Sequence, residues 1–311
     1  MTYRPLGESG LMVSAVGIGC NAFSRRVDQD GVADIIAAAR DTGVTLLDTA
    51  DVYGATLGAS EEMLGIALDG QRDEFVVATK FGGGRQPDGR ARASRSTIVA
   101  AVEGSLRRLR TDHIDLYQLH VPDDVTPIEE TLSALTDLVR AGKVRYVGSS
   151  NFSAWQIADA DWTARTAGLE RFVSAQNGYS LLDRAVEDEV VPACETYGIG
   201  LLPYFPLEYG LLTGKYRRGE EAPPGSRAAL DPERAQWLRD AEWDRIEALT
   251  AYAAERDLTL LDVAIAGLAA QPAVGSVISG ATRGEQVRAN AAALRWQPTA
   301  EDLVELDDLT G

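Results

Sequence analysis

The chain has 311 residues, of which 45% are hydrophobic and 25% are charged, the proportions of an ordinary globular protein. Its 47 acidic and 30 basic residues give a formal net charge of −17, which argues against nucleic acid and anionic membrane surfaces as partners. Two cysteines, no apolar leader and no apolar run of about 20 residues predict a cytoplasmic protein without a disulfide framework or a membrane span.

Short apolar runs alternate along the chain with longer amphipathic stretches. The first two runs, Tyr3–Leu6 and Met12–Ser14, predict a small β-hairpin. Most of the later runs are apolar along nearly their whole length, which is typical of parallel strands covered on both faces. The predicted strands are Ala15–Gly19, Val44–Thr49, Phe75–Lys80, Ile114–His120, Val144–Ser149, Phe172–Gln176, Ile199–Tyr204 and Ser276–Ile278.

The stretches between these strands carry apolar residues at helical spacing. Helices are predicted near Gly31–Thr42, Ser60–Leu68, Ser96–Leu109, Pro127–Ala141, Ser153–Ala167, Ala185–Tyr197, Leu260–Ala270 and Gly284–Ala293. Two connections are long for loops of this kind. The segment from Pro206 to about Asp240 is expected to form a lid, and the glycine-containing loop Gly82–Arg92 is expected to be mobile.

Eight strands that alternate with helices predict a (β/α)8 TIM barrel, formed as a single domain over residues 1–311 and capped at its bottom by the N-terminal hairpin. An open doubly wound sheet is the alternative. A dinucleotide-binding sheet of that kind carries G-x-G-x-x-G after its first strand, but here Gly17-Ile18-Gly19 continues into Cys20-Asn21.

Polar side chains stand at the ends of three consecutive predicted strands. Asp48 ends the second strand, with Tyr53 in the following loop, while Lys80 ends the third and His120 ends the fourth. The C-terminal ends of barrel strands meet at one rim, where such enzymes hold their active sites. We therefore expect the four side chains to lie together, although each one singly is more typical of a structural polar group.

These four residue types suit the reduction of a carbonyl group. Asp48 and Lys80 would form a desolvated ion pair, and the nearby ammonium would lower the Tyr53 pKa from its usual value of about 10. Tyr53 then becomes a general acid toward a carbonyl oxygen, which His120 orients through a hydrogen bond. A tyrosine acid needs a hydride donor, so a nicotinamide is expected beside it.

A different barrel chemistry would use Lys80 as a Schiff-base amine, in the manner of an aldolase. A metal-dependent hydrolase is disfavoured because the two histidines, His113 and His120, stand in separate contexts and cannot supply clustered ligands, so no metal site is expected.

Three segments resemble motifs of the aldo-keto reductases. They are Gly43-Val44-Thr45-Leu46-Leu47-Asp48-Thr49-Ala50-Asp51-Val52-Tyr53-Gly54, Leu116-Tyr117-Gln118-Leu119-His120, and Gly142-Lys143-Val144-Arg145-Tyr146-Val147-Gly148-Ser149-Ser150-Asn151-Phe152. The resemblance extends over essentially the whole chain. It implies a barrel that binds NADP(H) without a Rossmann domain and reduces small aldehydes or ketones. Some barrels of that family instead act mainly as nucleotide-holding, partner-binding proteins, such as the potassium-channel β subunits, and this regulatory role is the alternative function.

The resemblance also assigns roles to individual residues. Tyr53 matches the proton donor, Asp48 and Lys80 its activating pair, and His120 the residue that orients the substrate. The positions that match the cofactor site are Ser150, Asn151 and Gln176 at the carboxamide, Tyr204 stacked on the nicotinamide, Leu207, Leu212, Gly214 and Lys215 along the segment over the pyrophosphate, and Gly280, Thr282, Gln286 and Asn290 at the adenosine phosphate.

The adenosine end departs from the best-known members of that family. Gly280 and Gln286 stand where those members carry a lysine and an arginine, so Thr282 and Arg283 are the remaining donors for a 2′-phosphate. NADP(H) stays the expected cofactor, with weaker discrimination against NAD(H), because bidentate phosphate recognition is the strength of arginine. Neither the physiological substrate nor the oligomeric state can be read from the sequence.

Overall fold

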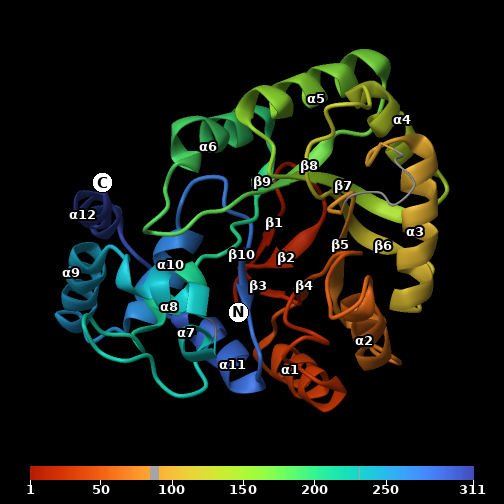
Figure 1. The fold of residues 1–311 in the computed structure, drawn as a ribbon. Helices are drawn as coiled ribbons and strands as arrows, with labels where there is room; N and C mark the ends of the chain where they lie inside the picture. The colour runs from red at the N-terminus through yellow and green to blue at the C-terminus, as the bar shows by residue number, and fades with distance from the viewer. Residues whose placement is uncertain (85–90, 231) are drawn as a thin grey trace.

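Eight parallel strands of a computed structural model, which describes residues 1–84, 91–230 and 232–311, form one curled sheet in the order β10-β3-β4-β5-β6-β7-β8-β9 (Figure 1). Isolated parallel bridges from Leu201 to Val274 and from Tyr204 to Ile278 join its two ends, so the (β/α)8 barrel is confirmed. The strands are β3 (Val16–Gly19), β4 (Leu46–Asp48), β5 (Val76–Phe81), β6 (Ile114–Leu119), β7 (Val144–Ser150), β8 (Phe172–Gln176), β9 (Gly200–Leu201) and β10 (Val277–Gly280).

Each predicted strand has a counterpart, and each predicted helix lies outside the sheet (Figure 1). The buried side chains of the longer helices form an apolar stripe. In α4 the buried residues Leu132, Leu135 and Leu138 form such a stripe. The helices that surround the barrel are α1 (Gln29–Thr42), α2 (Ala59–Ala67), α3 (Arg95–Leu109), α4 (Ile128–Arg140), α5 (Ala154–Ala167), α6 (Val186–Tyr197), α10 (Leu260–Ala269) and α11 (Gly284–Ala293). A 3-10 turn, η1 (Arg72–Glu74), precedes β5.

The N-terminal hairpin, β1 (Tyr3–Pro5) paired with β2 (Met12–Ser14), closes one end of the barrel. Its side chains Leu6, Leu11 and Val13 are buried in one apolar cluster with Leu46, Ala78, Leu116, Leu202 and Ile278, which come from five of the barrel segments. The expected cap at the bottom of the barrel is therefore present.

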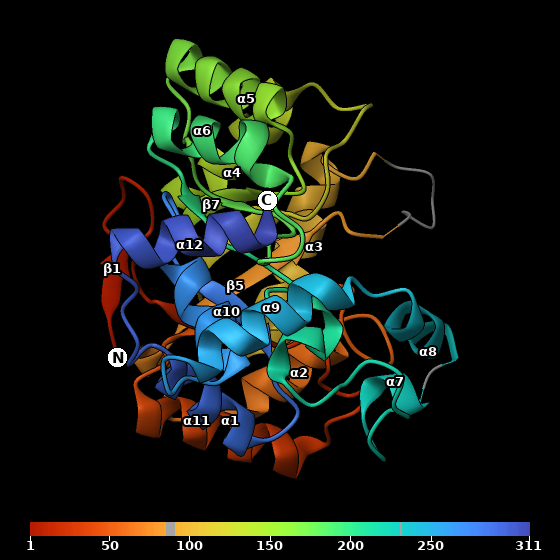
Figure 2. The same cartoon turned by 90° about the vertical axis from the view of Figure 1, so that its left-hand side faces the viewer.

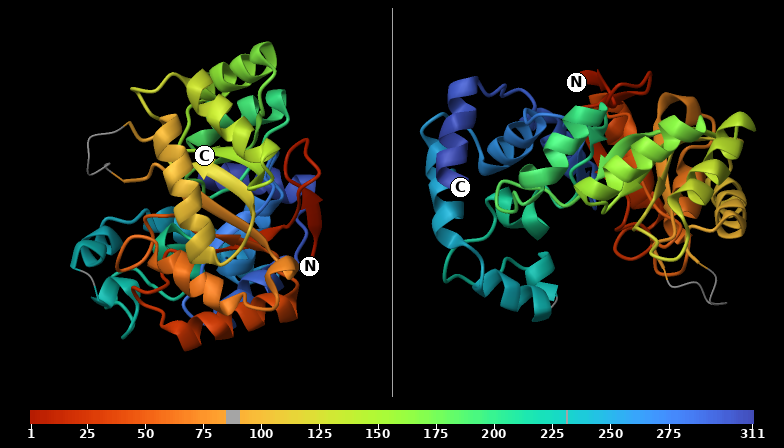
Figure 3. Two further views of the ribbon diagram at one scale, coloured as in Figure 1. Left: turned by 90° about the vertical axis from the view of Figure 1, so that its right-hand side faces the viewer. Right: turned by 90° about the horizontal axis from the view of Figure 1, so that it is seen from above.

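The segment after β9 lies on the opposite side of the barrel from the hairpin, as Figure 2 and the right-hand view of Figure 3 show. It was expected as a long loop, but it contains η2 (Glu208–Thr213), α7 (Arg227–Leu230) and α8 (Pro232–Arg239). Two further helices, α9 (Trp243–Ala254) and α12 (Ala300–Thr310), were not predicted. Residues 85–90 of the loop that was expected to be mobile lie outside the described residues.

Strand register decides which side chains reach the same rim. Asp48 pairs with Ala78 on β5, and Lys80, two residues further on, pairs with Gln118 on β6. Ser150 pairs with Gln176 across β7 and β8. Because all the strands are parallel, these residues meet at the C-terminal end of the barrel, away from the hairpin.

Candidate active site

A cavity of about 570 Å³ opens at the C-terminal end of the barrel strands. Most of the residues predicted for the site line it: Asp48, Tyr53, His120, Ser150, Asn151, Gln176, Tyr204, Leu207, Lys215, Gly280, Thr282, Gln286 and Asn290. A wider groove of about 870 Å³ lies near the N-terminal ends of β5 to β7, where arginines and acidic residues are mixed. Because barrel enzymes work at the other end, we place the candidate site in the smaller cavity.

Three predicted residues do not line the cavity. Lys80 is fully buried beneath the cavity, and its ammonium contacts two residues that do line it, Asp48 and Tyr53. Leu212 is fully buried in a second apolar cluster, and Gly214 ends η2 in the left-handed region at φ 74°. The last two therefore shape the segment over the cavity and do not face it.

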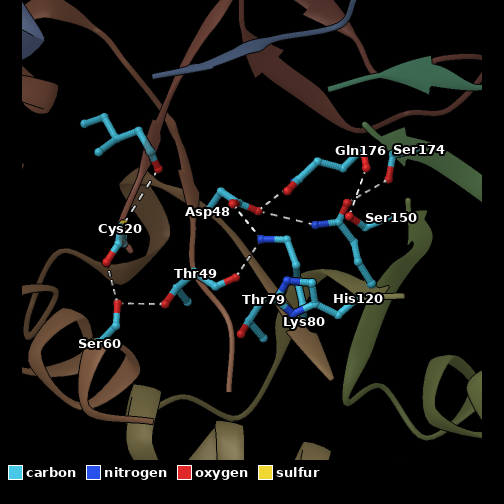
Figure 4. Close-up of polar contacts among 12 residues, drawn as sticks. Cys20, Asp48, Thr49, Ser60, Thr79, Lys80, His120, Ser150, Ser174 and Gln176 are labelled. Atoms are coloured by element: carbon cyan, nitrogen blue, oxygen red, sulfur yellow. Dashed lines mark hydrogen bonds and ion pairs between the residues drawn. The ribbon is translucent and has the colours of Figure 1, made fainter. Parts of the chain in front are cut away.

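Asp48 and Lys80 form an ion pair inside the barrel (Figure 4). Lys80 Nζ lies 2.6 Å from Asp48 Oδ2 and 3.0 Å from the Thr49 carbonyl oxygen, to which it also donates. The same ammonium lies 5.1 Å from the centre of the Tyr53 ring. The His120 ring meets the Tyr53 ring edge-on, with 5.7 Å between their centres. The structure thus brings the four predicted side chains together.

Burial governs the electrostatics of this group. Burial raises the pKa of Tyr53 above its ordinary value, and the opposing effect of the Lys80 charge is smaller, so the expected net lowering is wrong. Burial alone would lower the pKa of Lys80, but Asp48 and the Tyr53 hydroxyl hold it above its ordinary value. Burial and the Lys80 charge lower the pKa of His120 to about 3. At neutral pH the site therefore holds a protonated phenol, an ammonium and a neutral imidazole.

These charge states bear on the Schiff-base alternative. An amine that forms a Schiff base must be neutral and open to the carbonyl carbon. Lys80 has no exposed surface, its ammonium already donates to Asp48 and Thr49, and its pKa is raised. The geometry therefore disfavours a nucleophilic role for Lys80.

The amide and hydroxyl groups beside the ion pair form a connected network. Gln176 Nε2 donates to Asp48 Oδ1 at 2.9 Å, and Ser150 Oγ donates to the Gln176 carbonyl oxygen at 2.9 Å. Asn151 adopts a left-handed backbone at φ 61°, and its Oδ1 accepts from the Tyr204 hydroxyl at 2.7 Å. These bonds fix the orientation of the Tyr204 ring at the cavity wall. The link from Gln176 to Asp48 carried no sequence signal, because the two residues are 128 positions apart.

The cavity lining also includes cationic side chains. Lys215, predicted for the site, lines the cavity together with Arg26, Arg227 and Arg283. Gln286 Oε1 accepts hydrogen bonds from the Thr282 backbone N–H and hydroxyl, at 2.8 and 3.1 Å. Arg26 and Arg227 were not predicted for the site, because nothing in the sequence distinguishes them from the other loop arginines of this chain.

No group of three or more His, Cys, Asp or Glu side chains is arranged to hold a metal ion within residues 1–84, 91–230 and 232–311. None of the helices in that part of the chain combines the length and apolar content needed to cross a membrane.

Comparison with known proteins gives the family. Residues 15–310 match the model of the aldo/keto reductase family. The chain is 38% identical over 303 residues to a probable voltage-gated potassium channel subunit beta of Oryza sativa subsp. japonica, covering 94% of this chain and 91% of the relative. A protein of Arabidopsis thaliana with the same description is 37% identical, at 98% and 94% coverage. The uncharacterized oxidoreductase YrpG of Bacillus subtilis (strain 168) is 35% identical, at 99% and 96% coverage. With this match and the barrel-end cavity, the chain belongs to the aldo/keto reductase family of oxidoreductases.

Proposed function

We propose that this oxidoreductase reduces a small aldehyde or ketone to the alcohol with NADPH, and that Tyr53 is the proton donor. The observation that carries the proposal is the position of the Tyr53 ring: it faces the cavity beside neutral His120 and lies above the buried Lys80–Asp48 pair. A phenol that keeps its proton at neutral pH, next to a fixed ammonium, suits a general acid for a carbonyl oxygen.

The residues around the cavity fit a nicotinamide nucleotide, the cofactor that members of this family generally use. At the end near Tyr53, Ser150, Asn151 and Gln176 offer amide and hydroxyl groups of the kind that a carboxamide requires, and the Tyr204 ring offers a flat face. Elsewhere in the lining, Lys215 has no acidic partner among the described residues, so its charge is available to phosphate. The buried Ser279 hydroxyl also lacks a hydrogen-bond partner among them.

When bound, the reduced nicotinamide supplies a hydride to the carbonyl carbon. The Tyr53 hydroxyl transfers its proton to the carbonyl oxygen, and the Lys80 ammonium stabilises the phenolate that remains. His120 donates a hydrogen bond from its neutral ring to the same oxygen and orients it. Asp48 keeps Lys80 charged and in place through the 2.6 Å ion pair.

The preference for NADPH rests on the Thr282 hydroxyl and on the cationic side chains of the cavity, Arg283 among them. Arg283 lines the cavity, and its side chain is two-thirds exposed beside Glu285 at 3.4 Å. A single exposed arginine gives modest selectivity for a 2′-phosphate. We therefore propose that NADPH binds more tightly than NADH and that NADH still binds.

Fluorescence titration with NADPH and NADH, followed by cofactor oxidation with a panel of aldehydes and ketones, tests the proposal. Tyr53→Phe is expected to bind NADPH with unchanged affinity and to lose turnover, because only the transferable proton is removed. A Tyr53→Phe variant with the wild-type kcat on a good substrate would show that the acid is misassigned.

The second candidate function is a nucleotide-holding protein that binds a partner and turns over little, and it is favoured by the two relatives described as potassium channel β subunits. The same assay separates the two functions. Tight NADPH binding without oxidation by any member of the carbonyl panel would favour the partner-binding role.

A further inference from the structure

Helix α2 sends two consecutive, fully buried polar side chains, Ser60 and Glu61, toward the ends of the central strands. Ser60 Oγ and Thr49 Oγ1 lie 2.9 Å apart in a hydrogen bond, which Figure 4 shows. The Thr79 hydroxyl donates to Glu61 Oε1 at 2.6 Å. Each threonine is the chain neighbour of one member of the buried ion pair at the candidate site. One helix therefore holds both strand ends that deliver that pair.

The buried charge of Glu61 is matched by Arg108 at the end of α3. Arg108 Nε and Nη2 lie 2.7 and 2.6 Å from Glu61 Oε2, and Oε1 accepts from Thr79, so both carboxylate oxygens have partners. The guanidinium lies against two glycines, Gly58 and Gly104, whose missing side chains leave space for it. A Cβ at Gly58, whose φ is +77°, would lie 2.3 Å from Arg108 Nε, and one at Gly104 would lie 2.9 Å from Nη1. A side chain at either position would therefore force the guanidinium to shift.

Strand geometry connects the Glu61–Arg108 pair outside the barrel to the Lys80 charge inside it. Successive side chains of a strand point to opposite faces, so Thr79 points out of the barrel toward α2 when Lys80 points in. Fixing the Thr79 hydroxyl fixes the rotation of the strand end about its own axis, and with it the direction of Lys80. Thr49 adds a second constraint, because its carbonyl oxygen accepts from Lys80 Nζ at 3.0 Å.

We propose that Glu61, held by Arg108, is a positioning residue that aims Lys80 at Tyr53 through Thr79. The inference rests on the proposed function of Tyr53 as the acid. A buried carboxylate with partners on both oxygens has little freedom to move, so it holds the Thr79 hydroxyl, and with it the strand end, in one orientation. Misplacing a catalytic group by about 1 Å costs on the order of a hundredfold in rate, so the anchor has a kinetic consequence.

The test uses Thr79→Val, which removes the hydroxyl and keeps the volume, with Thr79→Ser as the rescue. Thr131→Val is the matched control, since Thr131 is also fully buried and donates to a backbone carbonyl, that of Ala93, at 3.0 Å. With NADPH and a good aldehyde, Thr79→Val is expected to lower kcat by about ten- to a hundredfold. The aldehyde KM and the NADPH affinity should stay within about twofold, and Thr79→Ser should restore most of kcat.

A second measurement reports on Lys80 without turnover. The chain has three lysines, Lys80, Lys143 and Lys215, so ¹⁵N labelling at Nζ gives three resonances that Lys143→Arg and Lys215→Arg variants assign. Thr79→Val is expected to move the Lys80 resonance and leave the other two in place. If Thr79→Val does not fold, Glu61→Gln is measured in the same way, because it removes the charge that Arg108 holds.

Two results would overturn the inference. One is a Lys80 resonance that stays in place in Thr79→Val, and the other is a loss of kcat that Thr131→Val reproduces in full. If the wild-type protein fails to oxidise NADPH with every carbonyl compound of the panel, the proposed function is refuted instead. The Lys80 resonance then still decides whether Glu61 and Thr79 set the position of that side chain.

Discussion

Asp51, three residues after β4, allows a stability prediction that needs no substrate. Its Oδ1 atom is buried and has no hydrogen-bond partner among the described residues. Burial, and after it the nearby Glu61 carboxylate, raise the pKa of Asp51 from 3.8 to about 7 against the opposing charges of Arg108 and Lys80. The folded protein therefore binds a proton that the unfolded chain has already released at pH 5 or 6.

The size of the effect follows from the shift. About three pKa units at about 1.4 kcal/mol each give an upper limit of about 4 kcal/mol. Because Asp51 is partly exposed, solvent screening reduces this to about 2 kcal/mol. The raised pKa lowers the free energy of unfolding as the pH rises from about 4 to about 7, and the loss stays constant above that.

Asp51→Asn keeps the shape and removes the charge. Urea denaturation at pH 4, 5, 6, 7 and 8 should show near-equal stability at pH 4, and a variant about 2 kcal/mol more stable at pH 8. Asp112→Asn is the control: the pKa of Asp112 is lowered by a hydrogen bond to His113 and by its charge, so this variant should gain nothing at high pH. Parallel pH curves for wild type and Asp51→Asn would refute the reasoning.

Three further predictions concern the site itself. Lys80→Met leaves Asp48 buried without its cation, so urea denaturation should show a loss of about 3–5 kcal/mol, and turnover should cease; near-normal activity would contradict this. Burial lowers the pKa of His120 to about 3, so the ring stays neutral above that pH, and its NMR shifts should not titrate between pH 5 and 8. Arg283→Ala should lower the NADPH-over-NADH affinity ratio by about tenfold, measured by fluorescence; an unchanged ratio would place the 2′-phosphate elsewhere.

The strands and the residues at their ends could be predicted because both are local signals. Strands covered on two faces are continuously apolar, and the ionisable residue that ends such a run stands out against it, as Asp48 and Lys80 do. The α12 helix was missed because nearly half of its residues are acidic and it buries only Leu306 and Thr310, which is too little for a readable stripe. The α9 helix did carry such a stripe, in Ile246, Leu249 and Tyr252, and could have been found.

The parts of the site that could not be predicted depend on how deeply a side chain is buried and on contacts between residues far apart in the sequence. The direction in which the Tyr53 pKa shifts follows from how completely the side chain is buried, and a sequence gives no measure of burial. The bond from Gln176 to Asp48 joins β8 to β4 across the barrel, and the Glu61–Arg108 pair joins two helices. Each joins residues far apart in the chain, so only the folded geometry reveals them.

The N-terminal hairpin covers the N-terminal end of the barrel interior. Leu6 and Val13 seal the floor beneath Leu46 and Ala78, each two residues below one member of the charged couple. Water admitted there would screen that couple from underneath and weaken its grip on the phenol. The first fourteen residues, none of which is assigned to the reaction, thus cover the end of the barrel below that couple, and a purification tag is better fused at the other terminus.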